Sequence, residues 1–405
     1  MLRVALITSR FPFGPKEPFL LEEVRELATR FDVRVVPTRL ARGTLQSHDI
    51  AAAVGPRLGV ASAATLAAAA GEIVRRPVTA LRTLATVVGA PRSLTAKLKN
   101  AATFPKALAV ARYARRERID HVHAYWLAAP ATVAYVVARM NGIPWSATGH
   151  RWDLVDYNLS STGRRNAGFI GDARFVRTIS AQGAQLVRSA LNGAGERVRV
   201  VHLGVRLPQP PARRDPVSRA LRLVCVAGLD PVKGHADLLH AIALARDAGV
   251  DVACTLAGDG PLRVRLESLA SDLDLGTRVR FCGGVEHSRL LERLRGGEFD
   301  AAILTSVDDG SHLREGIPVA LMEAMAAGLP CIATASGGVP ELVDATDGIL
   351  VPPRDVEAIA RAIATLAGDA GLRRTLAAGA RARIAAAFDV AQTATTLARL
   401  IAESA

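Results

Sequence analysis

The chain has 405 residues, half of them apolar, and a formal net charge of +13. This length exceeds what one hydrophobic core usually fills, so we expect two domains. The longest apolar runs, of about 14 and about 15 residues, are shorter than a membrane-spanning helix requires, which argues against an integral membrane protein.

The charge is divided unevenly along the chain. Residues 1–205 contain 29 Lys and Arg against 13 Asp and Glu, whereas residues 206–405 contain 22 against 25. A basic half beside a near-neutral half indicates that the first domain meets an anionic surface or ligand. A general solubility effect in an Arg-rich proteome is the alternative. No nucleic-acid partner is expected, because the basic half lacks Arg and Lys interleaved with aromatic residues.

The four cysteines lie in apolar, strand-like runs without C-x-x-C spacing; they are Cys225, Cys254, Cys282 and Cys331. The pattern predicts buried free thiols rather than disulfides or metal ligands, which fits a reducing cytoplasm. The first residues, MLRVALITSR, contain too short an apolar segment for a signal peptide and predict a strand. We therefore expect a cytoplasmic protein.

The chain begins with a β-α-β pattern. A strand is predicted over residues 4–8, a helix over residues 20–30 and a second strand over residues 32–36. This order predicts a parallel sheet with a right-handed crossover. No G-x-G-x-x-G opens the first helix, which counts against an NAD-binding domain, because close approach of a pyrophosphate requires those glycines.

Residues 45–118 are rich in Ala, Leu and Arg and predict several amphipathic helices. Such helices most often cover a sheet as part of the core. One of them could instead lie on a lipid surface, with Arg side chains among the headgroups and Leu and Val below.

Strands are predicted again over residues 121–126, 145–148, 177–180 and 197–202. His150 follows the second of these, and the carboxyl end of a strand is where open α/β sheets bind their ligands. A satisfied core histidine is the alternative.

The proline-rich residues 208–216 form the one obvious linker. We expect an N-terminal Rossmann-like domain over residues 1–205, a linker over 206–219 and a C-terminal domain over 220–388. A last helix over residues 389–405 would pack back on the N-terminal domain.

The second half alternates regularly between strand and helix. Strands are predicted over residues 221–227, 252–257, 279–282, 301–305, 331–334 and 349–351, with two Ala-rich helices at the end. This pattern predicts a second doubly wound parallel sheet, so the fold class is α/β.

Residues 314–341, REGIPVALMEAMAAGLPCIATASGGVPE, are predicted to form a loop, a short helix, a strand and a glycine-rich turn. Pro318 suits the first helical turn, while Gly328 and Pro330 end the helix. On one continuous helix, Glu315 and Glu323 would lie about 80° apart. With the helix beginning at Pro318, Glu315 lies in the entry loop and can converge with Glu323 on one ligand.

Five elements of the second half resemble, in the right order, the retaining nucleotide-sugar-dependent glycosyltransferases of family 4. They are VAGLDPVKGHADLLHAI, LAGDGPL, RVRFCGGV, REGIPVALMEAMAAGLPCIATASGGVPELV and GILVPPRD. The first half is similar in SRFPFGPKEPFLLEEVREL, HVHAYWLAAPATVAYVVARMNGIPWSATGHRWD and VRVVHLGV, with residues 44–110 matching least. The resemblance is greatest to the exopolysaccharide and colanic-acid branch. It implies the GT-B fold, in which two facing Rossmann-like domains border a cleft.

The resemblance also implies roles for individual residues. Glu323 would bind the ribose hydroxyls of the donor, Glu315 the hydroxyls of the transferred sugar, and Lys233 the diphosphate. Carboxylates suit hydroxyl groups and cations suit phosphates. His150 would contact the donor sugar near the reacting carbon, so we predict His150 and Glu315 as catalytic residues.

The remaining donor contacts would come largely from the backbone. A helix N-terminus at Gly316, Ile317, Pro318 and Val319 would stabilise the phosphate and the leaving group. The backbone of Gly284 and Val285 would meet the base, and Gly14 is a further donor-binding candidate. The pair Asp308 and Asp309 suggests a metal by spacing alone, but the resemblance implies neither a metal nor a cofactor.

One departure from the family pattern removes a cation. The family usually has arginine five residues before the lysine, where this chain has Gly228. The candidates for a replacement are Arg10, Arg151 and Arg314.

These observations predict a retaining, metal-independent hexosyltransferase with a UDP or GDP type of sugar donor. The acceptor would be a saccharide or a polyprenyl-diphosphate-linked saccharide in cell-surface polysaccharide synthesis. The basic first domain suggests peripheral contact with the anionic inner face of the plasma membrane. The alternatives are a non-catalytic glycosyltransferase-like scaffold subunit, which the absent arginine could suggest, and a GT-B sugar-nucleotide epimerase.

Overall fold

The protein is described from a computed structural model, in which the chain divides into two compact units. Unit 1 comprises Met1–His202 with Ala391–Ala405, and unit 2 comprises Leu203–Val390. The structure describes residues 1–13, 17–39, 50, 52–56, 59, 62–91, 93–150, 153, 167–191, 195–209, 220–308 and 315–405.

Unit 1 is built on a seven-stranded parallel sheet in the order β3-β2-β1-β4-β5-β6-β7. The strands are β1 (Arg3–Thr8), β2 (Asp32–Pro37), β3 (Ala53–Val54), β4 (His121–Ala124), β5 (Trp145–Gly149), β6 (Val176–Thr178) and β7 (Val198–Val200). The chain first adds strands on one side of β1 and then returns to the other side with β4. Such a reversal is the point at which open α/β sheets bind their ligands, outside the carboxyl ends of the strands.

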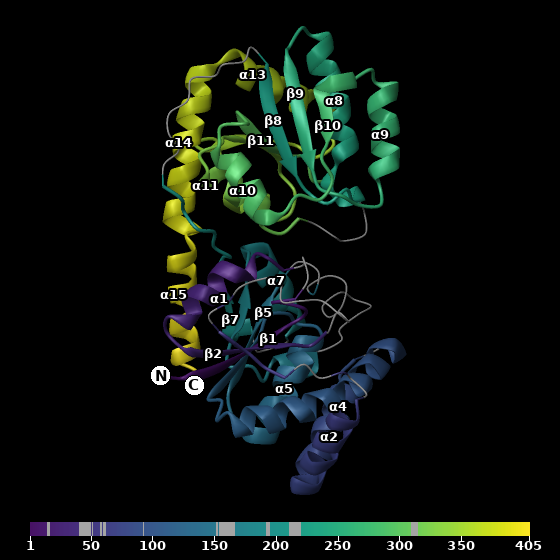
Figure 1. Ribbon diagram of the computed structural model, residues 1–405, viewed down its shortest axis with the longest axis vertical. Coiled ribbons are helices and arrows are strands. Elements are labelled where there is room, and N and C mark those ends of the chain that lie inside the picture. Colours follow the sequence, from purple (N-terminus) through teal and green to yellow (C-terminus); the bar gives the residue numbers. More distant parts are fainter. Residues whose placement is uncertain are drawn as a thin grey trace. The chain divides into compact units, whose positions relative to one another are not determined.

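Helices cover both faces of this sheet (Figure 1). They are α1 (Leu20–Ala28), α2 (Ala63–Arg75), α3 (Pro77–Gly89), α4 (Leu94–Arg116), α5 (Ala129–Asn141), α6 (Ala167–Ile170), α7 (Ala181–Ala190) and α15 (Val390–Ala402). Alternate residues of β1 point to opposite faces. Val4 and Leu6 join the core that contains α1 and α15, whereas Ala5 and Ile7 join the core that contains α4 and α5.

The predicted amphipathic region contains three helices, α2, α3 and α4. Ser62 and Ser93 cap α2 and α4 by accepting hydrogen bonds from backbone N–H groups, and Pro77 stands in the first turn of α3, where it needs no N–H partner. In Figure 1, α2 and α4 lie side by side at one end of unit 1.

The helix α15 belongs to unit 1 although it follows unit 2 in the chain. Leu397 and Ile401 are fully buried in the core that also contains Val4 and Phe31. Arg30 on the loop after α1 donates from Nη2 to Thr395 Oγ1 at 2.7 Å.

Unit 2 contains a six-stranded parallel sheet in the order β10-β9-β8-β11-β12-β13. Its strands are β8 (Leu221–Val226), β9 (Val252–Ala257), β10 (Val279–Phe281), β11 (Ala301–Leu304), β12 (Cys331–Thr334) and β13 (Gly348–Val351). The switch point lies between β8 and β11.

The helices of unit 2 connect these strands and complete its core (Figure 1). They are α8 (His235–Asp247), α9 (Arg263–Asp272), α10 (His287–Arg295), α11 (Val319–Ala326), α12 (Val339–Leu342), α13 (Val356–Gly368) and α14 (Ala370–Ala387). Three helices, α13 to α15, follow β13 where two were predicted. Asp369 starts a new helix by accepting the Leu372 N–H, which separates α13 from α14.

All four cysteines are free, as predicted, but Cys282 is only half-buried, unlike Cys225, Cys254 and Cys331. The difference arises because Cys282 lies just beyond β10, an edge strand of the sheet. Burial raises the pKa of the Cys225 thiol to about 12. The buried thiols are therefore protonated and act as small apolar side chains.

Candidate functional site

The switch point of unit 2 brings two predicted site residues together. Lys233 lies on the loop after β8, while Ser306 and Glu315 follow the neighbouring strand β11. Lys233 Nζ donates to Glu315 Oε2 at 2.5 Å, and Ser306 Oγ donates to the same oxygen at 2.9 Å. The carboxylate is thus fixed in place by two donors from different strand ends.

Two glycines allow the loops around this ion pair to touch backbone to backbone. Gly234 has φ +64°, and a Cβ there would lie 1.9 Å from the carbonyl oxygen of Thr305. Gly337, with φ +60°, would place a Cβ 1.8 Å from the carbonyl oxygen of Glu315. Only glycine fits either position, because the backbone conformation is left-handed and the Cβ would clash with backbone.

The second predicted carboxylate, Glu323, has a different partner. It lies on α11, which begins at Val319 and has Pro318 as its N-cap residue. Glu323 Oε1 lies 2.6 Å from Nε2 of His287, in the first turn of α10. The side chains are 11% and 32% exposed, so this carboxylate can still be reached by a ligand.

The backbone positions predicted for the base and phosphates also lie at strand ends of unit 2. Gly284 follows β10 and is exposed, with nothing within 4 Å of a Cβ built there. Gly316 to Pro318 lead directly into α11, where the N–H groups of Val319 and Ala320 precede the first helical hydrogen bonds, which Leu321 and Met322 donate to Pro318 O. The N-terminus of this helix is therefore available for an anion.

In unit 1, His150 lies directly after β5, at the carboxyl end of the sheet. Its ring centroid is 4.4 Å from that of Trp126 and 5.5 Å from that of Phe19. Burial, together with the nearby Arg177 guanidinium, lowers the pKa of His150 to about 3. The imidazole is therefore neutral near pH 7 and is no source of protons.

Asp153 fixes the loops that carry His150 and Leu127. One carboxylate oxygen accepts the His150 N–H at 2.7 Å and the other accepts the Leu127 N–H at 2.5 Å. Burial nevertheless raises the pKa of this carboxyl to about 8.

Several predicted residues lie outside the described part of the chain, namely Gly14, Arg151, Asp309 and Arg314. Arg10 belongs to unit 1, where its backbone N–H donates to Glu17 Oε2. Within the described residues, no cluster of three His, Cys, Asp or Glu side chains is arranged to hold a metal ion.

Sequence reasoning missed His287 and Ser306 as neighbours of the two predicted carboxylates. A polar residue directly beyond a strand end is the signal that could have found Ser306. Arg263, at the start of α9, was not among the residues predicted from the sequence. A Cβ at Gly283 would lie 3.2 Å from Arg263 Nη1, and the preceding residue, Leu262, donates its N–H to Leu229 O at 3.1 Å. Arg263 therefore lies beside the loops that contain Gly228 and Gly284.

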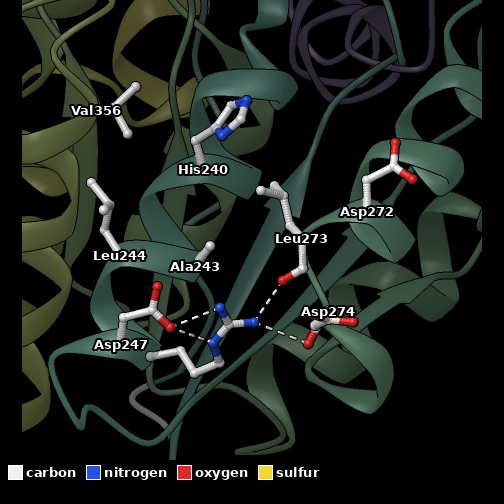
Figure 2. A pocket seen from close by; sticks show the side chains of 9 residues that line it. His240, Ala243, Leu244, Asp247, Asp272, Leu273, Asp274 and Val356 are labelled. Atoms are coloured by element: carbon white, nitrogen blue, oxygen red, sulfur yellow. Dashed lines mark hydrogen bonds and ion pairs between the residues drawn. The ribbon is translucent and has the colours of Figure 1, made fainter.

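An open pocket of about 460 Å³ in unit 2 lies away from this site (Figure 2). It is lined by the last turns of α8 and α9, including Asp247 and Asp272, near the edge where β9 begins. Arg246 pairs with Asp247 at 2.7 Å and donates to the carbonyl oxygens of Leu273 and Asp274. The guanidinium is engaged and carboxylates remain, so this pocket does not suit a diphosphate.

Two compact units, each built on a doubly wound parallel sheet, are the architecture of a GT-B protein. The family model described as "Glycosyl transferases group 1" matches residues 214–383. A GDP-mannose-dependent alpha-(1-6)-phosphatidylinositol monomannoside mannosyltransferase of Mycobacterium tuberculosis is 30% identical over 285 residues, which cover 66% of this chain and 72% of that protein. The chain belongs to the group 1 glycosyl transferases.

Relatives from polysaccharide synthesis match over a shorter length. The amylovoran biosynthesis glycosyltransferase AmsK of Erwinia amylovora is 31% identical over 203 residues, 49% of each chain. The putative colanic acid biosynthesis glycosyltransferase WcaL of Escherichia coli is 34% identical over 172 residues, 42% of each. The matches therefore span about half the length of these relatives or less.

Solved structures confirm the predicted GT-B fold over the full chain. HepE of Anabaena, crystallised with UDP, has a TM-score of 0.70 at 19% identity and covers 100% of both chains. Sucrose-phosphate synthase of Thermosynechococcus elongatus has a TM-score of 0.69 at 19% identity, with 100% of this chain and 99% of that chain covered.

Proposed function

We propose that this protein is a retaining glycosyltransferase that transfers a sugar from a nucleotide diphosphate to a saccharide or lipid-linked acceptor. The observation that carries the proposal is the pairing of Lys233 with Glu315 at the switch point of unit 2. A cation for phosphates and a carboxylate for sugar hydroxyls stand there side by side, which is the chemistry that a nucleotide sugar requires.

In this proposal, bound donor replaces contacts that the site residues now make with one another. The diphosphate takes the Lys233 ammonium and the N-terminus of α11, and the transferred sugar takes Glu315. Glu323 leaves His287 for the ribose hydroxyls, and the base lies against Gly284 and Val285. The sugar-contacting role of His150 stays a prediction.

Retention would follow from departure and attack on the same face of the sugar, with a phosphate oxygen assisting deprotonation of the acceptor. Charge stabilisation of the leaving diphosphate by Lys233 and the helix N-terminus would make a metal ion unnecessary. Metal independence is tested by measuring transfer in the presence of EDTA, where we expect unchanged rates.

Arg263 is our proposed replacement for the arginine absent at Gly228. It lies beside the two loops that flank the donor, and its present partners, Glu267 at 2.9 Å and Asp259 at 3.6 Å, are themselves largely exposed. Such surface ion pairs are weak, so a diphosphate can displace them.

The relatives suggest both the donor type and the acceptor. HepE was crystallised with UDP, and the mycobacterial relative is named as GDP-mannose-dependent. AmsK and WcaL are named for exopolysaccharide synthesis. We therefore propose a hexosyl donor of the UDP or GDP type and an acceptor used in cell-surface polysaccharide synthesis on the cytoplasmic face of the membrane.

Screening UDP- and GDP-sugars for thermal stabilisation identifies the donor, because a ligand that binds the folded state raises its stability by mass action. With that donor, Glu323→Ala should abolish transfer and leave the fold intact. Turnover near that of the wild type would refute the site assignment.

A non-catalytic scaffold subunit is the second candidate, favoured by Gly228 in place of the family's arginine. Calorimetric titration with UDP and GDP separates the two, since a scaffold need bind neither. Consumption of the donor without any acceptor would instead indicate an epimerase.

A further inference from the structure

We propose that the outer surface of α2, α3 and the first turns of α4 docks on a lipid membrane with anionic headgroups. This names the surface for the peripheral contact predicted from the sequence, and it does not depend on sugar transfer. No helix in the described part of the chain is long and apolar enough to span a membrane, so the proposed contact is with the membrane surface.

Exposed apolar side chains gather on this part of the molecule. Of the twelve exposed large apolar side chains among the described residues, seven lie between residues 66 and 98. We call them the apolar face: Leu66, Ile73, Val74, Val78, Leu81, Leu94 and Leu98. Val74 is 81% exposed and Leu94 72%.

Helical geometry places these side chains in rows rather than at random. Leu66 and Ile73 are seven residues apart on α2, and Leu94 and Leu98 are four residues apart on α4, spacings that return to the same side of a helix. Val78 and Leu81 are three apart on α3. Each helix thus exposes a pair of apolar residues on one side, and on α2 Val74 is exposed beside Ile73.

Other residues of the same helices are fixed in the core. Ala69 of α2 and Val87 of α3 are buried in the core cluster that includes α4 and α5. Asn100 of α4 donates to the carbonyl oxygen of Val87 at 2.8 Å, which ties α3 to α4. The packing of these helices against the core is therefore already defined, and the exposed apolar residues are not part of that core.

The charge around the apolar face complements an anionic surface. Residues 63–116 contain ten Lys and Arg, of which Lys106 is buried, and one acidic residue, Glu72. Glu72 is buried and paired with Arg75 and Arg115, each at 2.6 Å, so it offers no negative charge to the outside. Arg76, Arg82 and Lys99 are exposed among the apolar residues.

Apolar side chains flanked by exposed cations match a lipid interface, where the chains enter the acyl boundary and the cations meet headgroups. Nucleic acid would use the cations alone, since its phosphates offer nothing to Leu and Val. A second copy of this surface would place like charges opposite one another, which disfavours self-association.

The test is flotation of the full-length protein with vesicles of phosphatidylcholine and phosphatidylglycerol at low salt. We expect the wild type to float with these vesicles, to remain unbound with phosphatidylcholine alone, and to lose binding as salt screens the charges. Absence of flotation at low salt would overturn the proposal.

Two triple variants test separately the electrostatic and the apolar contributions to membrane binding. Each basic residue near an anionic surface adds about fivefold in affinity, so Arg76→Glu with Arg82→Glu and Lys99→Glu, which also add three negative charges, should weaken binding by at least about 100-fold. Val74→Gln with Leu81→Gln and Leu98→Gln keeps the charge and should weaken it about tenfold by removing buried apolar area.

Matched controls carry the same changes on exposed residues of unit 2. They are Leu244→Gln with Val264→Gln, and Arg265→Glu with Arg361→Glu and Arg374→Glu. Controls that lose binding as strongly as the test variants would show a general charge effect and overturn the assignment to this surface.

Two further outcomes would also overturn it. Apolar variants that float like the wild type would show an electrostatic contact of the kind that duplex DNA also makes, which a DNA-binding measurement would check. A wild type that sediments as a dimer, fails to float and becomes monomeric on Val74→Gln would make the face a self-association surface.

Discussion

In unit 1 the crossover from β3 to β4 carries three helices, α2 to α4, whereas the corresponding crossover of unit 2, from β10 to β11, carries α10 alone. The strand orders around β1 and β8 are otherwise alike. The added helices contain much of the positive charge of residues 1–205, while α10 carries His287, the partner of Glu323. The same sheet topology thus carries the proposed membrane surface in one unit and the proposed donor site in the other.

The ion pairs of the two units differ in the same way. Arg177 and Glu23 are fully buried, and their fork-like pair has N···O distances of 2.7 and 2.8 Å. Tyr125 also donates to Glu23, and two backbone oxygens accept from Arg177. Lys233 and Glu315 pair at the carboxyl ends of β8 and β11, where Ser306 donates to the same carboxylate oxygen, with the Lys233 and Glu315 side chains 17% and 6% exposed. A pair with every polar atom engaged stabilises the fold, whereas we propose that the pair at the strand ends of unit 2 exchanges its contact for a ligand.

The largest expected effect is on the pair of unit 1. Arg177→Met leaves a buried, unpaired carboxylate and should lower the free energy of unfolding by about 3–5 kcal/mol. All three tryptophans, Trp126, Trp145 and Trp152, belong to unit 1, so urea denaturation followed by tryptophan fluorescence reports on this unit. Adding Glu23→Gln should restore part of the loss, and a loss below 1 kcal/mol in the single variant would contradict the structural role.

The pair of unit 2 should respond in activity rather than in stability. Charge-assisted contacts contribute about 1.5–3 kcal/mol, so Lys233→Met should lower kcat/KM about 10- to 150-fold. We expect the thermal midpoint of unit 2 to fall less than that of unit 1 in Arg177→Met, because Ser306 still donates to Glu315, and Lys233→Arg to retain much of the activity. A strongly lowered midpoint would instead make this pair structural like that of unit 1.

Acid should lower the free energy of unfolding of unit 1 mainly through its buried histidines. Burial lowers the pKa of His121 to about 3, below its ordinary value of 6.5, and that of His123 well below 6.5. Below pH 6.5 the unfolded chain takes protons that the folded unit does not, so stability is lost as the pH falls. Each such histidine removes about 2 kcal/mol by pH 5.

His121→Gln tests this expectation because it keeps a polar group near Ser146 Oγ, which lies 2.7 Å from His121 Nε2. The free energy of unfolding of unit 1, measured at pH 7, 6 and 5, should then fall less steeply with acid than in the wild type. An unchanged slope would show that His121 does not carry this part of the acid sensitivity.

The smallest effect expected concerns the absent arginine. Arg263→Met should weaken UDP or GDP binding by up to about tenfold, at the low end of charge-assisted contacts because the side chain is partly exposed. Arg265→Met on the same helix is the matched control. Equal effects of the two variants in calorimetric titration would rule out a specific contact by Arg263.

The strand and helix pattern was predictable because hydrophobic periodicity and glycine or proline stops are local signals. Lys233 and Glu315 were predicted by resemblance, and their contact follows from the strand order, which brings residues 82 positions apart to one edge. The pairing of Arg177 with Glu23 spans 154 positions and had only one local signal, an arginine inside a buried strand. The partner of Glu323 was missed because His287 lies in the first turn of a largely exposed helix and resembles a surface residue.

The packing of α15 determines the order in which the units can fold during synthesis. Domains usually fold in turn from the N-terminus as they leave the ribosome. Here Leu397 and Ile401 complete the core around Val4 and Phe31, yet they are translated after all of unit 2. The core of unit 1 therefore lacks the side chains of α15 until unit 2 has emerged from the ribosome. A fragment that stops at the linker would expose that part of the core to solvent.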